Sequence, residues 1–157
     1  ELYRKGLTGE ELGAIITDME IEDPFSVNGV LDTAAWANTG TTGPTVGEAL
    51  LRAGHKLRRA DKNRIQGKIQ IHEYLKTRES GRPKLQIFNT CPNLIRELQS
   101  IPLSKNNPED VDTHASDHAY DALRYMIMSR PRMENPLERM RGFKRDMFKP
   151  ADSDFGY

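Results

Sequence analysis

The sequence predicts an α/β fold, with a mixed sheet flanked by helices, in a chain of 157 residues. Amphipathic helical patterns alternate along the chain with short apolar runs of strand length, which is typical of this class. Capping motifs mark the expected helix starts, and polar residues follow the expected strands. A chain of this length forms one domain with room for a hydrophobic core.

The composition narrows the classes of function. Lys and Arg together number 23, as do Asp and Glu, so the net charge is zero, and only the distribution of charge can indicate a nucleic-acid partner. Cys91 is the single cysteine, which excludes an internal disulfide and a cysteine-rich zinc site. No apolar run approaches the roughly 18 residues of a membrane span, and no signal peptide opens the chain. Because the sequence begins at Glu1 within what reads as an element, we expect a piece of a longer protein.

Two helices are expected in the first third of the chain, over residues 8–20 and 46–53. Each begins at a capping box, in which a Thr hydroxyl and a Glu carboxylate three residues later satisfy backbone N–H groups reciprocally. The two pairs are Thr8 with Glu11 and Thr45 with Glu48. Gly54 then ends the second helix.

A short buried strand is expected over residues 27–31, directly before Asp32. A carboxylate just past the carboxyl end of a strand is well placed for a site at the edge of a sheet. Asp is also common after strands, so this position alone is weak evidence. The Gly- and Thr-rich residues 37–45 that follow predict a loop, either plain surface or in reach of substrate phosphates, without a Walker A pattern.

Basic residues crowd between residues 52 and 68 of this neutral chain. The run is either a solvated face or a track for the phosphate backbone of duplex DNA. The DNA-binding candidates are Lys56, Arg58, Arg59, Lys62 and Arg64. No aromatic residue interleaves, so the run does not indicate stacking on single strands. A helix follows it, on which Ile65, Ile69 and Leu75 are expected to face the core.

The next region predicts a strand and a helix. Residues 84–88 alternate in hydropathy like a strand, and Pro92 opens a helix over residues 93–99. Leu94, Ile95 and Leu98 are expected to point inward from that helix. Cys91 is expected to be a small packed residue and not a nucleophile, since the sequence places no base beside it.

The organising feature is a helix that begins near Ser116, after an acidic loop over residues 106–112. Ser116 can cap the first turn, and Asp117 suits the positive end of the helix dipole. Helical spacing places Asp117, Asp121 and Arg124 on one face with His118 at its edge. The opposite, core-facing side is predicted to hold Ala119, Ala122, Leu123, Met126 and Ile127. The acidic face is either a solvated surface or a site for a divalent cation.

Four stretches of the sequence carry a resemblance to a known family. They are DTAAW from Asp32, ADKNRIQGKIQIHEYL from Ala60, LQIFNTCPNLIREL from Leu85 and SDHAYDALRYMIMSRP from Ser116. In this order they resemble the C-terminal nuclease domain of the large terminase subunit of tailed bacteriophages. The last stretch matches over about a dozen positions without a gap, which is far more specific than an acidic pair.

The resemblance implies an RNase H-like fold and two-metal phosphodiester hydrolysis with Mg²⁺ or Mn²⁺. It implies that Asp32 and Asp121 are metal-binding and catalytic carboxylates. Asp117 would be an alternative or additional metal ligand, and His118 would help to bind metal or orient water. The family's first carboxylate, the first strands of its sheet and its packaging ATPase domain would all lie upstream of Glu1. We therefore expect this chain by itself to hold an incomplete site that is weak or inactive.

The resemblance also implies boundaries and partners. Residues 1–131 would form the partial nuclease domain, and residues 132–157 a charged, partly disordered C-terminal extension. The parent protein would act in the host cytoplasm, away from membranes, on double-stranded DNA, together with the procapsid portal and the small terminase subunit. Two alternatives stay open, a cellular RNase H-like resolvase with the same carboxylates and a non-catalytic module that docks the packaging motor on the portal.

Overall fold

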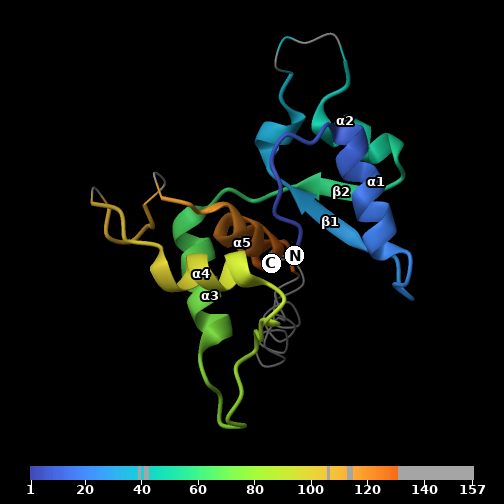
Figure 1. The fold of residues 1–157 in the computed structure, drawn as a ribbon. Helices are drawn as coiled ribbons and strands as arrows, with labels where there is room; N and C mark the ends of the chain where they lie inside the picture. Colours follow the sequence, from blue (N-terminus) through green and yellow to red (C-terminus); the bar gives the residue numbers. More distant parts are fainter. Residues whose placement is uncertain (39, 41–42, 106, 113–114, 131–157) are drawn as a thin grey trace, which may run out of the picture.

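The computed structural model describes residues 1–38, 40, 43–105, 107–112 and 115–130. The expected C-terminal extension, residues 132–157, lies outside the described residues. The described elements are α1 (Gly9–Glu20), β1 (Asn28–Leu31), the 3-10 helix η1 (Thr33–Trp36), α2 (Val46–Arg52), β2 (Lys56–Arg59), α3 (Arg64–Leu75), α4 (Pro92–Ser100) and α5 (His118–Ser129). Figure 1 shows two groups, with α1 and α2 beside the strands and α3, α4 and α5 packed together. None of the described helices has the length and hydropathy needed to span a membrane.

Both capping boxes are confirmed. The backbone N–H of Glu11 donates to the Thr8 hydroxyl at 3.2 Å, and Thr8 N–H donates back to the Glu11 carboxylate at 2.8 Å. The same reciprocal pair begins α2. Helix α1 lies so close to α2 that a Cβ at Gly9 would be 2.7 Å from the Cβ of Ala49, so glycine is required at this crossing.

The described sheet consists of β1 and β2, which pair in parallel from Asn28 opposite Lys56 to Leu31 opposite Arg59. The crossover between them carries η1 and α2, as a parallel connection requires. The α/β class is thus confirmed, whereas the mixed sheet expected from the sequence is not seen in the described part of the chain, whose one sheet is purely parallel. Both strands end at the same edge, where Ala60 N–H donates to the Leu31 carbonyl at 2.9 Å.

The main hydrophobic core lies between α3, α4 and α5. Its buried members are Ile71, Val111, Tyr120, Leu123 and Ile127, and Leu94 and Leu98 of α4 pack against them as expected. The expectation for α3 is wrong, because the side chains of Ile65, Ile69 and Leu75 are exposed. The helix instead turns the face with Gly67 and Ile71 toward α5. Gly67 has no side chain, so α3 can approach α5 closely on this face. The face of α3 that packs on α5 is therefore not the one with the most large apolar residues.

The strand expected over residues 84–88 is absent from the described structure, where Lys84 lies in a bend and residues 85–88 have no regular secondary structure. Its side chains keep the expected alternation, since Leu85 and Ile87 are half-buried while Gln86 and Phe88 are exposed. Leu85 N–H donates to the Tyr74 carbonyl at 2.9 Å. Alternating hydropathy determines which side chains of a segment are buried. A strand also needs a neighbouring strand for its backbone hydrogen bonds, and neither β1 nor β2 pairs with this segment.

Candidate functional site

Helix α5 begins at His118, and the residue at its N-cap is Asp117, whose side chain makes no capping hydrogen bond. The expectation that Ser116 caps this helix is therefore wrong. The carboxylate of Glu97 on α4 takes that role, accepting from the N–H groups of Ala119 at 2.7 Å and Tyr120 at 3.0 Å. Ser116 instead donates its hydroxyl to Glu97 at 3.1 Å. The first turn of α5 is thus fixed by a neighbouring helix.

Three carboxylates converge on the guanidinium of Arg64 at the start of α3. Its Nε lies 2.9 Å from Asp110 Oδ2, its Nη1 lies 3.5 Å from Asp121 Oδ2, and its Nη2 lies 3.8 Å from Asp117 Oδ2. These four residues and Arg124 are called the Arg64 cluster below. The cluster joins α3, the acidic loop and the first turn of α5, so the face with Asp117 and Asp121 is not a solvated surface.

The second cation of the cluster is Arg124, whose side chain is only 2% exposed. Its Nε donates to Asp121 Oδ1 at 3.0 Å, and its guanidinium lies 4.4 Å from the centre of the Tyr125 ring. Burial lowers the pKa of Arg124, but the hydrogen bond to Asp121 and the charge of that carboxylate raise it by more. Two buried guanidinium nitrogens, Nη2 of Arg64 and Nη1 of Arg124, have no hydrogen-bond partner among the described residues. The cluster therefore contains guanidinium N–H groups that donate no hydrogen bond to a described residue.

The two carboxylates of α5 repel each other. The pKa of Asp117 is raised, first by burial and then by the negative charge of Asp121, against the opposing charges of Arg64 and His118. A like-charge carboxylate pair at partial burial is an arrangement that an added cation stabilises. Oxygen ligands are also those that Mg²⁺ prefers.

Asp32 lies directly after β1, as the sequence predicts, and begins η1. Its Oδ1 accepts from Ala34 N–H at 2.7 Å, its Oδ2 accepts from the Tyr125 hydroxyl, and Lys62 Nζ lies 3.6 Å away. The hydrogen bonds from Ala34 and then Tyr125 lower the pKa of Asp32 against the effect of burial. Asp32 is therefore an ionised carboxylate held by α5.

Tyr125 links Asp32 to the Arg64 cluster. Burial, the hydrogen bond to Asp32 and the negative charge of Asp121 raise the pKa of the Tyr125 hydroxyl to about 12. The hydroxyl thus stays protonated and remains a donor to Asp32 at neutral pH. Tyr125 thus contacts Asp32 through its hydroxyl and, through its ring, the Arg124 guanidinium that is hydrogen-bonded to Asp121.

A divalent cation can be tested against these ligands. In the described part of the chain, no group of three His, Cys, Asp or Glu side chains is arranged to hold a metal ion. Mg²⁺ is, however, commonly held by one or two carboxylates, with water and substrate phosphates completing its shell. The pair of Asp117 and Asp121 fits that requirement in ligand chemistry. The Arg64 guanidinium contacts both of these carboxylates.

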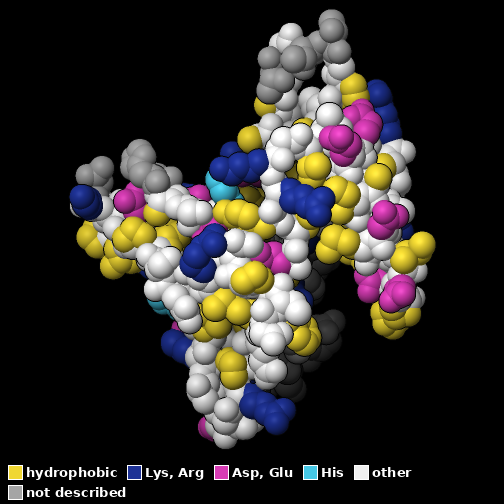
Figure 2. Space-filling view, viewed as in Figure 1, with side chains coloured by type: hydrophobic (Ala, Val, Ile, Leu, Met, Phe, Trp, Pro, Cys, Tyr) yellow, Lys and Arg dark blue, Asp and Glu magenta, His cyan; other side chains and the backbone are white. Residues whose placement is uncertain are grey.

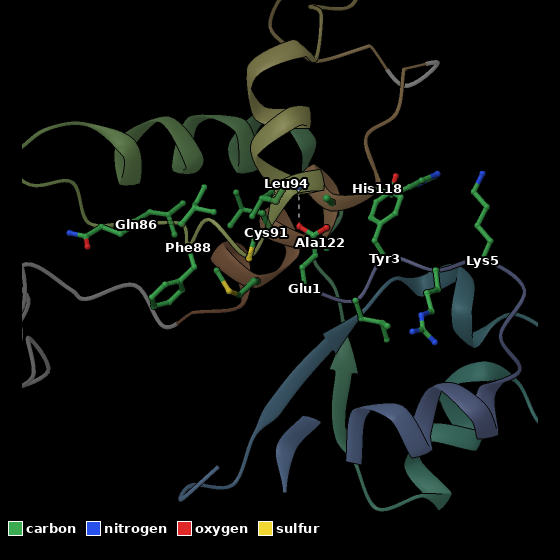
Figure 3. Close-up of a pocket in the computed structure, with 16 residues that line it drawn as sticks. Glu1, Tyr3, Lys5, Gln86, Phe88, Cys91, Leu94, His118 and Ala122 are labelled. Atoms are coloured by element: carbon green, nitrogen blue, oxygen red, sulfur yellow. Dashed lines mark hydrogen bonds between the residues drawn. The ribbon is translucent and has the colours of Figure 1, made fainter. Parts of the chain in front are cut away.

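His118 lies at the first position of α5 with a side chain that is 72% exposed. Its Nδ1 is 3.9 Å from Asp117 Oδ1, and its ring centre is 6.5 Å from that of Tyr3. It also lines a mainly apolar cavity of about 680 Å³, formed by residues 1–5, residues 85–88 and the exposed side of α5. Figure 3 shows His118 beside Tyr3, and Leu94, Cys91 and Phe88 toward the other end of this cavity. Ala122 lines the cavity too and is exposed, so its expected place on the core face is wrong.

The five basic candidates divide into two groups. Lys56, Arg58, Arg59 and Lys62 are exposed, while Arg64 is turned into its cluster of carboxylates. Some of the exposed side chains have local partners, since Arg58 donates to the Ser129 carbonyl and Arg59 lies 5.2 Å from the centre of the Trp36 ring. On the face in Figure 2, basic side chains stand in several separate groups among acidic and hydrophobic ones.

Sequence reasoning missed three residues of this site, namely Glu97, Asp110 and Tyr125. Glu97 carried a usable signal, since it is an acid three residues after Leu94 and four before Ile101, on the apolar side of α4. An acid in that position indicates a buried polar partner. Asp110 lies in the loop that the sequence marks as acidic, without a signal for Arg64 as its partner, and nothing in the spacing of Tyr125 indicated Asp32 as its partner.

No family model, no curated protein and no solved structure matches the chain. The functional assignment therefore depends on the geometry of the site and on the motifs that resemble terminases.

Proposed function

We propose that the chain is part of the RNase H-like nuclease domain of a large terminase subunit and contributes carboxylates to metal-dependent cleavage of double-stranded DNA. One observation carries this proposal. The Tyr125 hydroxyl of α5 donates to Asp32 at the end of β1, and Asp121, one turn earlier on α5, is hydrogen-bonded to Arg124, whose guanidinium lies over the Tyr125 ring. These are the two carboxylates that the motif resemblance assigns to the metal site, and they come from elements far apart in the sequence.

The residues of the chain have separate tasks in this proposal. Asp32 and Asp121 supply oxygen ligands to Mg²⁺ or Mn²⁺, with Asp117 as an alternative or additional ligand, and the Tyr125 hydroxyl donates to Asp32 and favours its ionised form. When bound, two such ions activate water and stabilise the leaving 3′ oxygen. His118 is exposed with its Nδ1 3.9 Å from Asp117 Oδ1, and in this proposal it orients water or adds a ligand.

The exposed basic residues Lys56, Arg58, Arg59 and Lys62 bind the phosphate backbone of the duplex in this proposal. Phosphate contacts fix the position of DNA without reading its sequence, which suits cleavage of concatemers by a packaging motor. The procapsid portal and the small terminase subunit are then the protein partners of the parent molecule, in the host cytoplasm.

A non-catalytic docking module is the second candidate, and one observation favours it. Arg64 pairs with Asp117 and Asp121, and Arg124 pairs with Asp121, so these carboxylates already have cationic partners. A cluster satisfied by its own cations could serve only to hold α3, α5 and the acidic loop together. A portal-binding surface would then be the role of the domain.

Plasmid cleavage separates the two candidates. The protein encoded by the complete reading frame is incubated with supercoiled plasmid and Mn²⁺, and nicked and linear products are measured. We expect cleavage by the wild type, none by Asp32→Asn or Asp121→Asn, and reduced cleavage by Asp117→Asn. Asp18→Asn, the same change at an exposed position of α1, is the matched control and should cleave normally.

Circular dichroism of each variant reports whether the fold is intact. Full activity of Asp121→Asn, with Asp117→Asn inactive, would reverse the assignment of the essential acid. A folded wild-type protein that cuts no DNA at any Mn²⁺ concentration would favour the docking module.

A further inference from the structure

We infer that Arg64 is a built-in counter-ion of the Asp117–Asp121 pair, and that a divalent cation binds this pair by displacing the guanidinium onto Asp110. The inference rests on the proposed metal site and adds a residue that competes with the ion. It also changes the role of Arg64, which the sequence placed in the DNA-binding run.

The distances within the Arg64 cluster indicate which contact of Arg64 is strong and which contacts are weak enough to break. The Nε of Arg64 donates a hydrogen bond to Asp110 at 2.9 Å. The Nη atoms stand farther from their acids, at 3.5 Å from Asp121 and 3.8 Å from Asp117, outside good hydrogen-bond range. Nη2 makes no hydrogen bond within the described residues. The guanidinium is thus anchored on the acidic loop and only loosely paired with α5.

The position of Arg64 in the fold allows this movement. It is the first residue of α3, and its backbone is fixed by the Asn63 cap, whose side chain accepts from Gln66 N–H at 3.0 Å. Its side chain is 25% exposed and so has an outlet to solvent. Arg124 offers the contrast, because its side chain is 2% exposed and its Nε is hydrogen-bonded to Asp121. Arg64 is therefore the cation that can leave, and Arg124 is the one that stays.

The charge of the cluster favours a further cation. Three aspartates and two arginines leave one net negative charge. Asp117 and Asp121 both lie near the same guanidinium, that of Arg64, so their two negative charges stand close together. A divalent ion between these two carboxylates interacts with both at shorter range than a guanidinium at 3.5 to 3.8 Å. Its affinity is then set by the cost of moving Arg64.

Mn²⁺ binding to the 157-residue chain, measured by electron paramagnetic resonance of the free ion, tests the inference without any catalytic readout. The informative variant is Arg64→Gln. The matched control is Lys68→Gln, which removes one positive charge four residues later on α3, where the Lys68 ammonium donates to the backbone carbonyls of Pro108 and Glu109 in the same acidic loop.

We expect Arg64→Gln to bind Mn²⁺ at least about tenfold more tightly than the wild type, a gain of about 1.4 kcal/mol. Lys68→Gln should change the affinity by no more than about threefold, because exposed charges are screened. Adding Asp121→Asn to Arg64→Gln should remove the gain, since the pair then loses one carboxylate.

Each other result has a distinct meaning. Equal binding by wild type and Arg64→Gln, with weaker binding by Asp121→Asn, would overturn the inference and leave the proposed metal site standing. Weaker binding by Arg64→Gln would also overturn it, because Arg64 would then position the ligands. Binding by none of the proteins would refute both the inference and the metal site.

Side-chain NMR of the wild type keeps the test decisive if Arg64→Gln fails to fold. Titration with Mg²⁺ should free the Nη groups of Arg64 to rotate, while its Nε signal and that of Arg124 change little. Unchanged Nη signals of Arg64 at saturating Mg²⁺ would overturn the displacement.

Discussion

The carboxylate of Glu97 on α4 accepts a hydrogen bond from the backbone N–H of Tyr120 on α5, at 3.0 Å. The same side chain accepts from Ala119 N–H and from the hydroxyls of Tyr3 and Ser116, and it is 1% exposed. We expect Glu97→Gln to lower the free energy of unfolding by about 1.5–3 kcal/mol, the cost of a hydrogen bond to a charged group. Urea unfolding measures this, with Glu73→Gln, an exposed position, as the matched control. Equal losses in both variants would contradict the role of Glu97.

The stabilisation by Glu97 should depend on pH. Burial raises its pKa, but the hydrogen bonds from Tyr120, Tyr3, Ser116 and Ala119 lower it by more, to below the ordinary value of 4.5. A depressed carboxylate pKa stabilises the folded state above the ordinary value and loses that effect as pH falls through the folded pKa. The stability difference between wild type and Glu97→Gln should therefore be full at neutral pH and shrink below 4.5. A difference that stays constant down to pH 2 would contradict this linkage.

Asp117→Asn should stabilise the protein at neutral pH. The dipole argument from sequence predicts a small loss, but Asp117 makes no capping hydrogen bond, and burial and Asp121 raise its pKa. A raised carboxylate pKa means that stability falls as pH rises from 3.8 through the folded pKa, and the penalty remains above it. Thermal unfolding should show a higher Tm for Asp117→Asn at pH 7 and equal Tm values below pH 3.8. A lower Tm at pH 7 would restore the dipole interpretation.

Gly67→Ala tests the crossing of α3 and α5. A Cβ at Gly67 would lie 2.4 Å from Cγ and 2.7 Å from Cδ of Arg124, whose buried side chain has little room to move. Overpacking of this kind costs about 1–3 kcal/mol, against a helix-propensity gain of about 1 kcal/mol. We expect a net loss of stability by urea unfolding. Gly43→Ala, where a Cβ meets nothing within 4 Å, is the control and should change little.

Reversing the charges of Arg58 and Arg59 should weaken binding to duplex DNA of any sequence. Each lost phosphate contact should also reduce the slope of log affinity against log salt by about 0.9. Fluorescence anisotropy at several salt concentrations measures both effects. The control reverses Arg78 and Arg82, which are also exposed and lie at the turn after α3. Unchanged affinity at low salt would make residues 56–59 a solvated face.

The sequence by itself determined most elements of this fold, because their signals are local. The two capping boxes, the strand before Asp32 and the proline that opens α4 all depend on residues within one or two turns of each other. Such signals work before any tertiary contact exists. The acidic pair of α5 was found in the same way, from helical spacing alone.

The tertiary structure alone decided which faces of these elements pack together and which of their charged and hydrogen-bonding groups pair. Residues 84–88 carry the pattern of a strand but lack a pairing neighbour among the described residues. Helix α3 turns Gly67 toward α5, because the two helices cross too closely for a Cβ at this position. Glu97, and not Ser116, caps the first turn of α5. Arg64, which belongs to the basic run in the sequence, pairs with Asp117 and Asp121 in the structure. Partners of charged and hydrogen-bonding groups are chosen by distance in space, which spacing along the chain does not specify.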